Sequence, residues 1–169
     1  MGDGWETKRS YSKDHQDWVT IKLCVFLIPF ILLNFIHSNR GAPAYLATAI
    51  IDTIHFKGNF PESCDIRGIY NQEREPDVNN GGWKMILSPA KLSPNRMHFF
   101  QLNGPSEKYT HVKVSIYPDG GIKRVRIIGT LAAKIEPGAA ETTASLREDG
   151  ERHCIIVEEG WEILEGNQG

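Results

Sequence analysis

The segment Ile50–Cys64, IIDTIHFKGNFPESC, places an acid, an imidazole, an ammonium group and an amide within eight residues. His55 titrates near neutral pH and suits general acid–base catalysis. Lys57 could hold a substrate carboxylate, and Asn59 could donate a hydrogen bond to a developing oxyanion. If a strand runs through this segment, its period of two puts His55 and Lys57 on one face and Asp52 on the other. The alternative interpretation is structural, a histidine at a strand end beside a solvated lysine.

Two further groups of residues could assist such chemistry. In the opening MGDGWET, Trp5 could wall a pocket and Glu6 could act as a base or orient a histidine. The alternative there is a loop whose tryptophan anchors the core. Lys113, Arg124 and Arg126 predict a basic face that could attract an anion, and Arg126 is the candidate for substrate binding. The alternative for these three residues is a solvated outer face of a sheet.

The remaining histidines and the cysteines argue against a metal site or a disulfide framework. No ligand-like spacing joins the other histidines considered, His15, His37, His98 and His153. The three cysteines, Cys24, Cys64 and Cys154, are widely spaced and form no CxxC pair. No cofactor is evident in the sequence, and a divalent metal ion stays open as the alternative. A reducing compartment fits this cysteine usage, either the cytoplasm or, as the alternative, the peroxisome.

The charge distribution divides the chain into a body and a tail. Residues 1–131 carry 16 Lys and Arg against 12 Asp and Glu, whereas residues 132–169 carry 3 against 9. The mildly basic body suits a small anionic ligand and lacks the dense basic stripe of a nucleic-acid-binding protein. Within the acidic tail, residues 132–151 predict a linker, and the following HCIIVEEGWEIL predicts a small hairpin.

Alternating patterns predict strands along most of the body. They are DWVTIKL, ATAIIDTIHF, KMILSP, MHFFQL and the two halves of THVKVSIYPDGGIKRVRIIG. Pro118–Gly121, between those two halves, predicts a hairpin because Asp-Gly favours tight turns. The polar segment 71–82 predicts an exposed loop. Together these features predict an all-β fold, an antiparallel β-sandwich. Because nothing precedes MGDGWET, we expect this sandwich to be incomplete.

An apolar run, Leu23–Ile36, interrupts the pattern between two predicted strands. It is shorter than the roughly 20 residues that a membrane-spanning helix needs, and Pro29 breaks it. Three interpretations stay open. The run could be a membrane anchor, which we consider the weakest of the three, a buried core segment or loop, or translated intron sequence.

Four segments, taken in order, resemble the allantoicase family. They are MGDGWETKRS, DWVTIKL, IIDTIHFKGNFPESC and THVKVSIYPDGGIKRVRIIG. The resemblance implies a jelly-roll-like, galactose-binding-like sandwich, the second of two tandem repeats, covering 1–131. Deleting 24–40 restores a family-like join, DWVTIKLGAPAYLATAIIDT, which favours the intron interpretation for that insert.

The resemblance also implies a function. Allantoicases hydrolyse allantoate to ureidoglycolate and urea, and we expect the family's full-length enzyme to be a homo-oligomer. In this chain the implied site residues are His55, Lys57 and Asn59, with Glu6 or Asp52 as helper. Because a whole repeat is absent, we expect a fragment that could be inactive. A sandwich that binds a ligand without catalysis is the alternative function.

Overall fold

A computed structural model describes residues 4–10, 12, 14–23, 43–73, 75–103, 107–132, 153–155 and 163–166. All regular secondary structure in these ranges is β-strand, as the sequence predicts. Within the same ranges, no helix is long and apolar enough to cross a membrane.

The first of two large antiparallel sheets is built around β3, and we call it the β3 sheet. Its strand order is β11-β10-β3-β6, and β7 also pairs with β3. The bounds are His153–Ile155 for β11, Arg124–Leu131 for β10, Ala44–Asp52 for β3, Met97–Gln101 for β6 and Lys108–Tyr109 for β7.

The second large sheet is built around β8, and we call it the β8 sheet. Its strand order is β12-β2-β8-β4-β5, and every pairing is antiparallel. The bounds are Ile163–Gly166 for β12, Asp17–Lys22 for β2, His111–Tyr117 for β8, Ser63–Ile69 for β4 and Lys84–Lys91 for β5.

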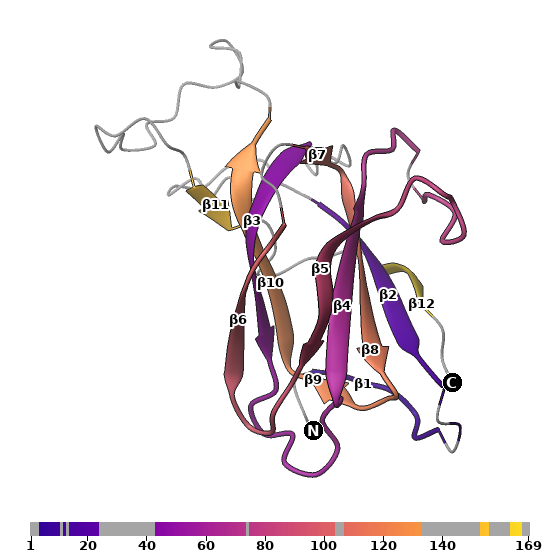
Figure 1. Cartoon of the computed structure of the whole chain (residues 1–169), viewed down its shortest axis with the longest axis vertical. Coiled ribbons are helices and arrows are strands. Elements are labelled where there is room, and N and C mark those ends of the chain that lie inside the picture. The colour runs from indigo at the N-terminus through magenta and orange to yellow at the C-terminus, as the bar shows by residue number, and fades with distance from the viewer. Residues whose placement is uncertain are drawn as a thin grey trace, which may run out of the picture.

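The two sheets lie face to face, and a short ribbon closes one end of the sandwich (Figure 1). This ribbon pairs β1, Trp5–Glu6, with β9, Gly121–Ile122. In Figure 1 it lies at the lower end, where the loop that joins β3 to β4 also turns. The expected antiparallel sandwich is therefore confirmed.

Apolar side chains at alternating positions fill the space between the sheets. In most strands they point inward while polar neighbours point outward, as a period of two requires, whereas β6 exposes Met97 and Phe99. The fully buried members include Ile21, Leu46, Ile51, Ile66, Ile86, Val112, Val114, Ile116 and Ile127. Because both sheets contribute, they share one core.

The hairpin predicted around Pro118–Gly121 is wrong. β8 already has β2 on one side and β4 on the other, so no edge of it is left for β10. β10 instead pairs with β3 in the opposite sheet. The turn thus carries the chain across the sandwich, and its last residues pair with β1.

The other predicted strands agree with the structure, with shifts at their ends. DWVTIKL, KMILSP and MHFFQL correspond to β2, β5 and β6. The segment 71–82 contains no strand among its described residues. β11 and β12 pair with β10 and β2 respectively, so the small hairpin expected in the tail does not form between them. The insert 24–40 lies outside the described residues.

Candidate functional site

Three segments that the sequence singled out meet at the lower end of the sandwich. Trp5 pairs with Ile122 and Glu6 pairs with Gly121 across the β1–β9 ribbon. The Gly121 N–H donates to the carbonyl oxygen of Asn59 at 2.7 Å. We call this region, residues 4–7, 52–60 and 119–122, the motif end. It brings together side chains that are more than 50 positions apart in the chain.

The strand that leads into the motif end stops at Asp52. Its buried carboxylate accepts a hydrogen bond from the Ile54 N–H at 2.8 Å, and the Phe56 N–H donates to the Thr53 carbonyl at 3.0 Å. These bonds form a turn, in which His55 has a φ of 77°. The prediction that His55 and Lys57 share a strand face is therefore wrong, because the Asp52 side chain replaces the strand ladder with a turn.

A second loop holds this turn in place. The Thr53 hydroxyl donates to the carbonyl oxygens of Ser93 and Arg96, at 2.7 and 3.0 Å. The His55 N–H donates to Asn95 Oδ1 at 3.0 Å, and the Asn95 N–H donates back to the Phe56 carbonyl at 3.1 Å. Hydrogen bonds between backbone groups and the side chains of Thr53 and Asn95, together with bonds between backbone groups, thus fix the turn, and the imidazole of His55 takes no part in them.

Two adjacent glycines allow the third segment to approach this loop. Gly120 has a φ of 136°, and a Cβ there would lie 2.7 Å from the Pro61 nitrogen. A Cβ on Gly121 would lie 1.9 Å from Cε1 of Phe56. Only glycine meets both demands, the backbone conformation at the first position and the close contact at the second.

One side-chain contact joins the motif segments directly. The Asn59 side-chain amide donates to Oε1 of Glu6, and both side chains are exposed. Glu6 was expected to serve as a base or to orient a histidine, and in the structure its described partner is Asn59. This bond commits one amide N–H of Asn59 to Glu6 and leaves the other available for a ligand.

The remaining site candidates occupy different environments. His55 and Lys57 are exposed, and neither side chain has a polar contact with the described residues. Asp52 is 3 % exposed and its carboxylate supports the turn. The Trp5 indole packs against the core and is half-buried. The motif end therefore presents a free imidazole and a free ammonium group on a fixed backbone.

Arg126 lies on β10, two positions beyond Arg124, which pairs with Asp52 of the motif end. It alternates with the buried Val125 and Ile127, so it points outward from the β3 sheet, opposite Ile50. Lys113 points outward from the β8 sheet, on the other side of the sandwich. The single basic face predicted for these residues is therefore wrong, because their strands belong to different sheets.

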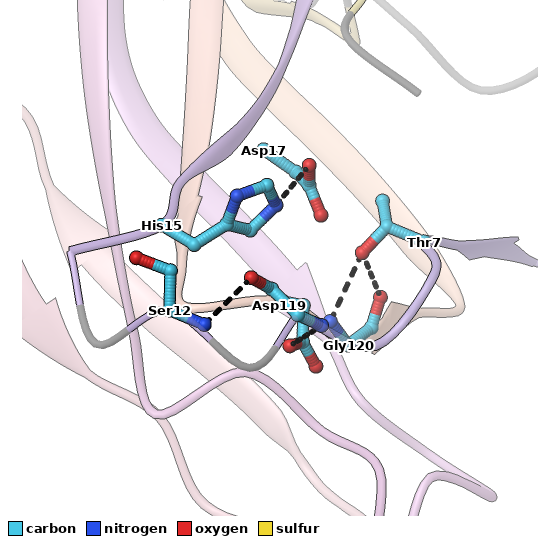
Figure 2. A network of polar contacts seen from close by, with 7 residues as sticks. Thr7, Ser12, His15, Asp17, Asp119 and Gly120 are labelled. Carbon is cyan, nitrogen blue, oxygen red and sulfur yellow. Dashed lines mark hydrogen bonds and ion pairs between the residues drawn. The ribbon is translucent and has the colours of Figure 1, made fainter. Parts of the chain in front are cut away.

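A histidine–aspartate pair that the sequence reading passed over lies next to this region (Figure 2). His15 Nε2 is 2.9 Å from Oδ1 of Asp17, whose side chain is fully buried, and the other carboxylate oxygen of Asp17 has no hydrogen-bond partner. The backbone N–H of Ser10 donates to Asp119 at 2.7 Å. The His-x-Asp spacing was the available signal, because residues i and i+2 of an extended chain share a side.

No group of three or more histidine, cysteine, aspartate or glutamate residues suited to a metal ion occurs among the residues that the structure describes.

Comparisons with known proteins match most of the chain to one family. The family model "Allantoicase repeat" matches residues 1–132. Allantoicase of Neurospora crassa is 37% identical over 133 residues, which are 78% of this chain and 33% of that protein. A probable allantoicase of Schizosaccharomyces pombe is 42% identical over 79% of this chain and 34% of its own length.

A solved structure agrees with these matches. The crystal structure of allantoicase from Saccharomyces cerevisiae superimposes with a TM-score of 0.54 and 31% identity, over 73% of this chain and 30% of that chain. The chain thus spans about a third of the length of the relatives it matches.

Proposed function

Because this chain belongs to the allantoicase family, we propose that it takes part in the hydrolysis of allantoate to ureidoglycolate and urea, a step of purine breakdown. The observation that carries the proposal is the meeting of three distant segments at the motif end. There the Glu6–Asn59 pair belongs to the same short region as the free side chains of His55 and Lys57.

The reaction requires two kinds of group. Allantoate carries one carboxylate and two ureido groups on a single carbon. Hydrolysis breaks the bond from that carbon to one ureido nitrogen and forms a bond to a water oxygen. One proton of the water ends on the departing urea nitrogen, and the other stays on the new hydroxyl group. The enzyme therefore needs an anchor for the carboxylate and a proton shuttle.

We assign these roles to the motif end. Lys57 holds the carboxylate, since Arg126 points outward from the β3 sheet. His55 donates a proton to the departing nitrogen, and the Glu6 carboxylate takes one from the attacking water. Asn59, held by Glu6, offers its second amide N–H to the substrate. Asp52 helps indirectly by fixing the turn, and Trp5 walls the ribbon side.

A second function, ligand binding without catalysis, is favoured by one observation. The chain matches about a third of the length of its relatives, and a region of that size can hold a binding surface without a complete set of catalytic groups. In that case this sandwich would bind allantoate but release no urea.

Urea release from allantoate distinguishes the two functions. One sample is the chain itself, and the other is a chimera in which residues 1–132 replace the matching third of Neurospora crassa allantoicase. Lys57→Met should weaken allantoate binding in either sample, whereas the change Lys91→Met, at another exposed lysine, on β5, should not. Urea release supports the enzyme, binding alone supports the module, and the absence of both contradicts the proposal.

We also infer a cytoplasmic homo-oligomer. Cys64 is buried and unpaired, which suits a reducing compartment. Phe99 is 68% exposed and Met97 42% exposed on β6, which has one described neighbour, β3. Exposed apolar side chains on an edge strand favour association. Light scattering with Phe99→Ser, against Tyr70→Ser as control, tests the assembly.

A further inference from the structure

The side chain of His98 links β3 to the loop that holds the turn at His55. His98 lies on β6, opposite Ile51 of β3. Its Nδ1 is 3.1 Å from the Ile51 carbonyl oxygen, and the Ser93 N–H donates to its Nε2 at 2.8 Å. The imidazole therefore joins the end of β3 to the start of residues 93–96, a part of the β5–β6 loop that we call the bracing loop.

The two hydrogen-bond partners fix the protonation of this ring. The Ile51 carbonyl oxygen can only accept, so Nδ1 carries a hydrogen and donates it. The Ser93 N–H can only donate, so Nε2 is unprotonated and accepts. The ring also stacks on Phe100, with centroids 6.2 Å apart and planes 9° from parallel. Position 98 thus uses a flat group with one donor and one acceptor, and both nitrogens are occupied.

The bracing loop carries this restraint to the turn. The carbonyl oxygen of Ser93, whose N–H is held by His98, accepts a hydrogen bond from the Thr53 hydroxyl at 2.7 Å. Two residues further on, Asn95 Oδ1 accepts the His55 N–H at 3.0 Å. A shift of Ser93 would therefore move acceptors that both Thr53 and His55 use.

The backbone of the turn needs such a brace. His55 has a φ of 77°, and Asn95, which accepts its N–H, has a φ of 54°. Positive φ is unfavourable for a residue with a side chain and persists where the surrounding structure imposes it. Because the two residues are bonded to one another, both conformations depend on the position of the bracing loop.

We propose that His98 is a positioning residue for the reaction. Through the bracing loop it sets the direction in which His55 presents its imidazole. The catalytic part of this inference rests on the proposed function, in which His55 donates the proton, whereas the control of the turn by His98 does not. His98 itself has no free nitrogen, so it acts through the loop and not by proton transfer.

Two substitutions separate the bonds of His98 from its ring. His98→Phe keeps a flat ring for the stack on Phe100 but loses both bonds. His98→Gln loses the ring but offers a donor and an acceptor on either side of one carbon, as the two ring nitrogens are. Gln101→Leu, at an exposed residue of the same strand, is the control. His98→Met, with a side chain that adapts to irregular gaps, replaces His98→Phe if that variant does not fold.

Hydrogen exchange of the His55 N–H in the full chain reports on the turn directly. His98→Phe should speed this exchange by at least about tenfold, because a weakened brace lets the bond to Asn95 open more often. His98→Gln and Gln101→Leu should stay near the parent rate. The Val114 N–H is the internal reference, because β8 is paired on both sides and its exchange would change only with the stability of the whole sandwich.

Kinetics tests the consequence for the reaction, in the chain or in the chimera with Neurospora crassa allantoicase, whichever releases urea. His98→Phe should lower kcat about tenfold to a hundredfold, because a displaced catalytic group costs rate. KM should change little, because the described bonds of the bracing loop end on Thr53, His55 and Phe56 and not on Lys57. His98→Gln should recover most of the lost kcat.

The outcomes separate this role from the proposed function. Unchanged exchange of the His55 N–H in a folded His98→Phe would overturn the control of the turn, and so would His98→Gln exchanging as fast as His98→Phe. Faster exchange with an unchanged kcat would overturn the positioning role. If exchange responds as expected while neither parent sample releases urea, His98 controls the turn and the proposed function falls.

Discussion

The ring of Phe56 lies so close to the backbone of Gly121 that no side chain fits between them. A Cβ on Gly121 would be 1.9 Å from one ring carbon and 2.1 Å from the next. The same ring is 3.3 Å from the position that a Cβ on Gly4 would take. Phe56 thus joins the loop after β3 to Gly121 of β9 and to Gly4, the residue before β1, and the motif end depends on these contacts.

The first prediction follows from this contact. Gly121→Ala should lower the free energy of unfolding by about 1–3 kcal/mol, because the methyl group forces the ring or the ribbon to move. Gly81→Ala is the matched control, since nothing lies within 4 Å of a Cβ there, and it should stay within about 0.5 kcal/mol. Urea denaturation measures both. Equal stability of the two variants would show that Phe56 moves aside freely.

The second prediction concerns alkaline pH. Burial, followed by the hydrogen bond and the negative charge of Asp65, raises the pKa of Tyr117 to about 12. An unfolded tyrosine titrates near 10, so the stabilising contribution is complete below about pH 10 and is lost as the pH rises toward 12. The free energy of unfolding should fall across that window, and Tyr117→Phe should flatten the fall. Tyr70→Phe, an exposed tyrosine, is the control. A fall that is unchanged in Tyr117→Phe would contradict the assignment.

The alternation of side chains predicted most strands and faces but not their partners. β8 and β10 have the expected inward residues, Val114 and Val125 among them. Alternation is the same for a hairpin and for two strands in opposite sheets, so Asp119-Gly120 alone could not decide between them. What decides is that β2 and β4 occupy both edges of β8, a long-range fact that no local pattern contains.

The residues of the candidate site were proposed from the sequence, and their arrangement in space was predicted less well. The β-branched Ile54 and the aromatic Phe56 extend the strand pattern past Asp52, yet the Asp52 carboxylate bonds to the Ile54 N–H and ends the strand. The side chain of a single residue thus outweighs a propensity summed over several. The Glu6–Asn59 contact depends on the β1–β9 pairing, and the sequence of a two-residue strand is too short to predict its partner.

The third prediction is that residues 24–40 can be removed. The Leu23 N–H donates to the Thr110 carbonyl at 2.9 Å, and Ala44 pairs with Tyr109. Leu23 and Ala44, which flank this segment, therefore lie beside two residues that are adjacent in the sequence. Gly41, Ala42 and Pro43 would then span up to about 14 Å when extended, more than the roughly 10 Å between packed sheets.

Removing the 17 residues from 24 to 40 shortens the connection, which should stabilise the fold by roughly 1–2 kcal/mol of loop-closure entropy. Thermal unfolding followed by circular dichroism should stay cooperative, with an equal or higher midpoint. A variant with Gly and Ser in place of the same residues keeps the loop length and serves as control. Loss of cooperative unfolding in both variants would show that the apolar run belongs to the core.

The last prediction separates the fold from the chemistry at His55. Its φ of 77° lies in the left-handed region, which costs a residue with a side chain about 1–2 kcal/mol relative to glycine. Strain of this kind persists where surrounding bonds impose it, here the bonds from Asp52 and Asn95, and it is often found at functional sites. His55→Gly should therefore unfold at the same or a higher urea concentration than the parent chain.

Turnover should respond in the opposite direction. If His55 shuttles a proton, His55→Gly should release urea from allantoate about a hundredfold to ten-thousandfold more slowly in the chimera with Neurospora crassa allantoicase. Free imidazole should restore part of the lost rate, because the glycine leaves space for it and the proposed substrate anchor, Lys57, is unchanged. His55→Gln should be equally slow without responding to imidazole. A folded His55→Gly chimera with near-parental turnover would remove His55 from the mechanism and leave its backbone conformation as a feature of the turn alone.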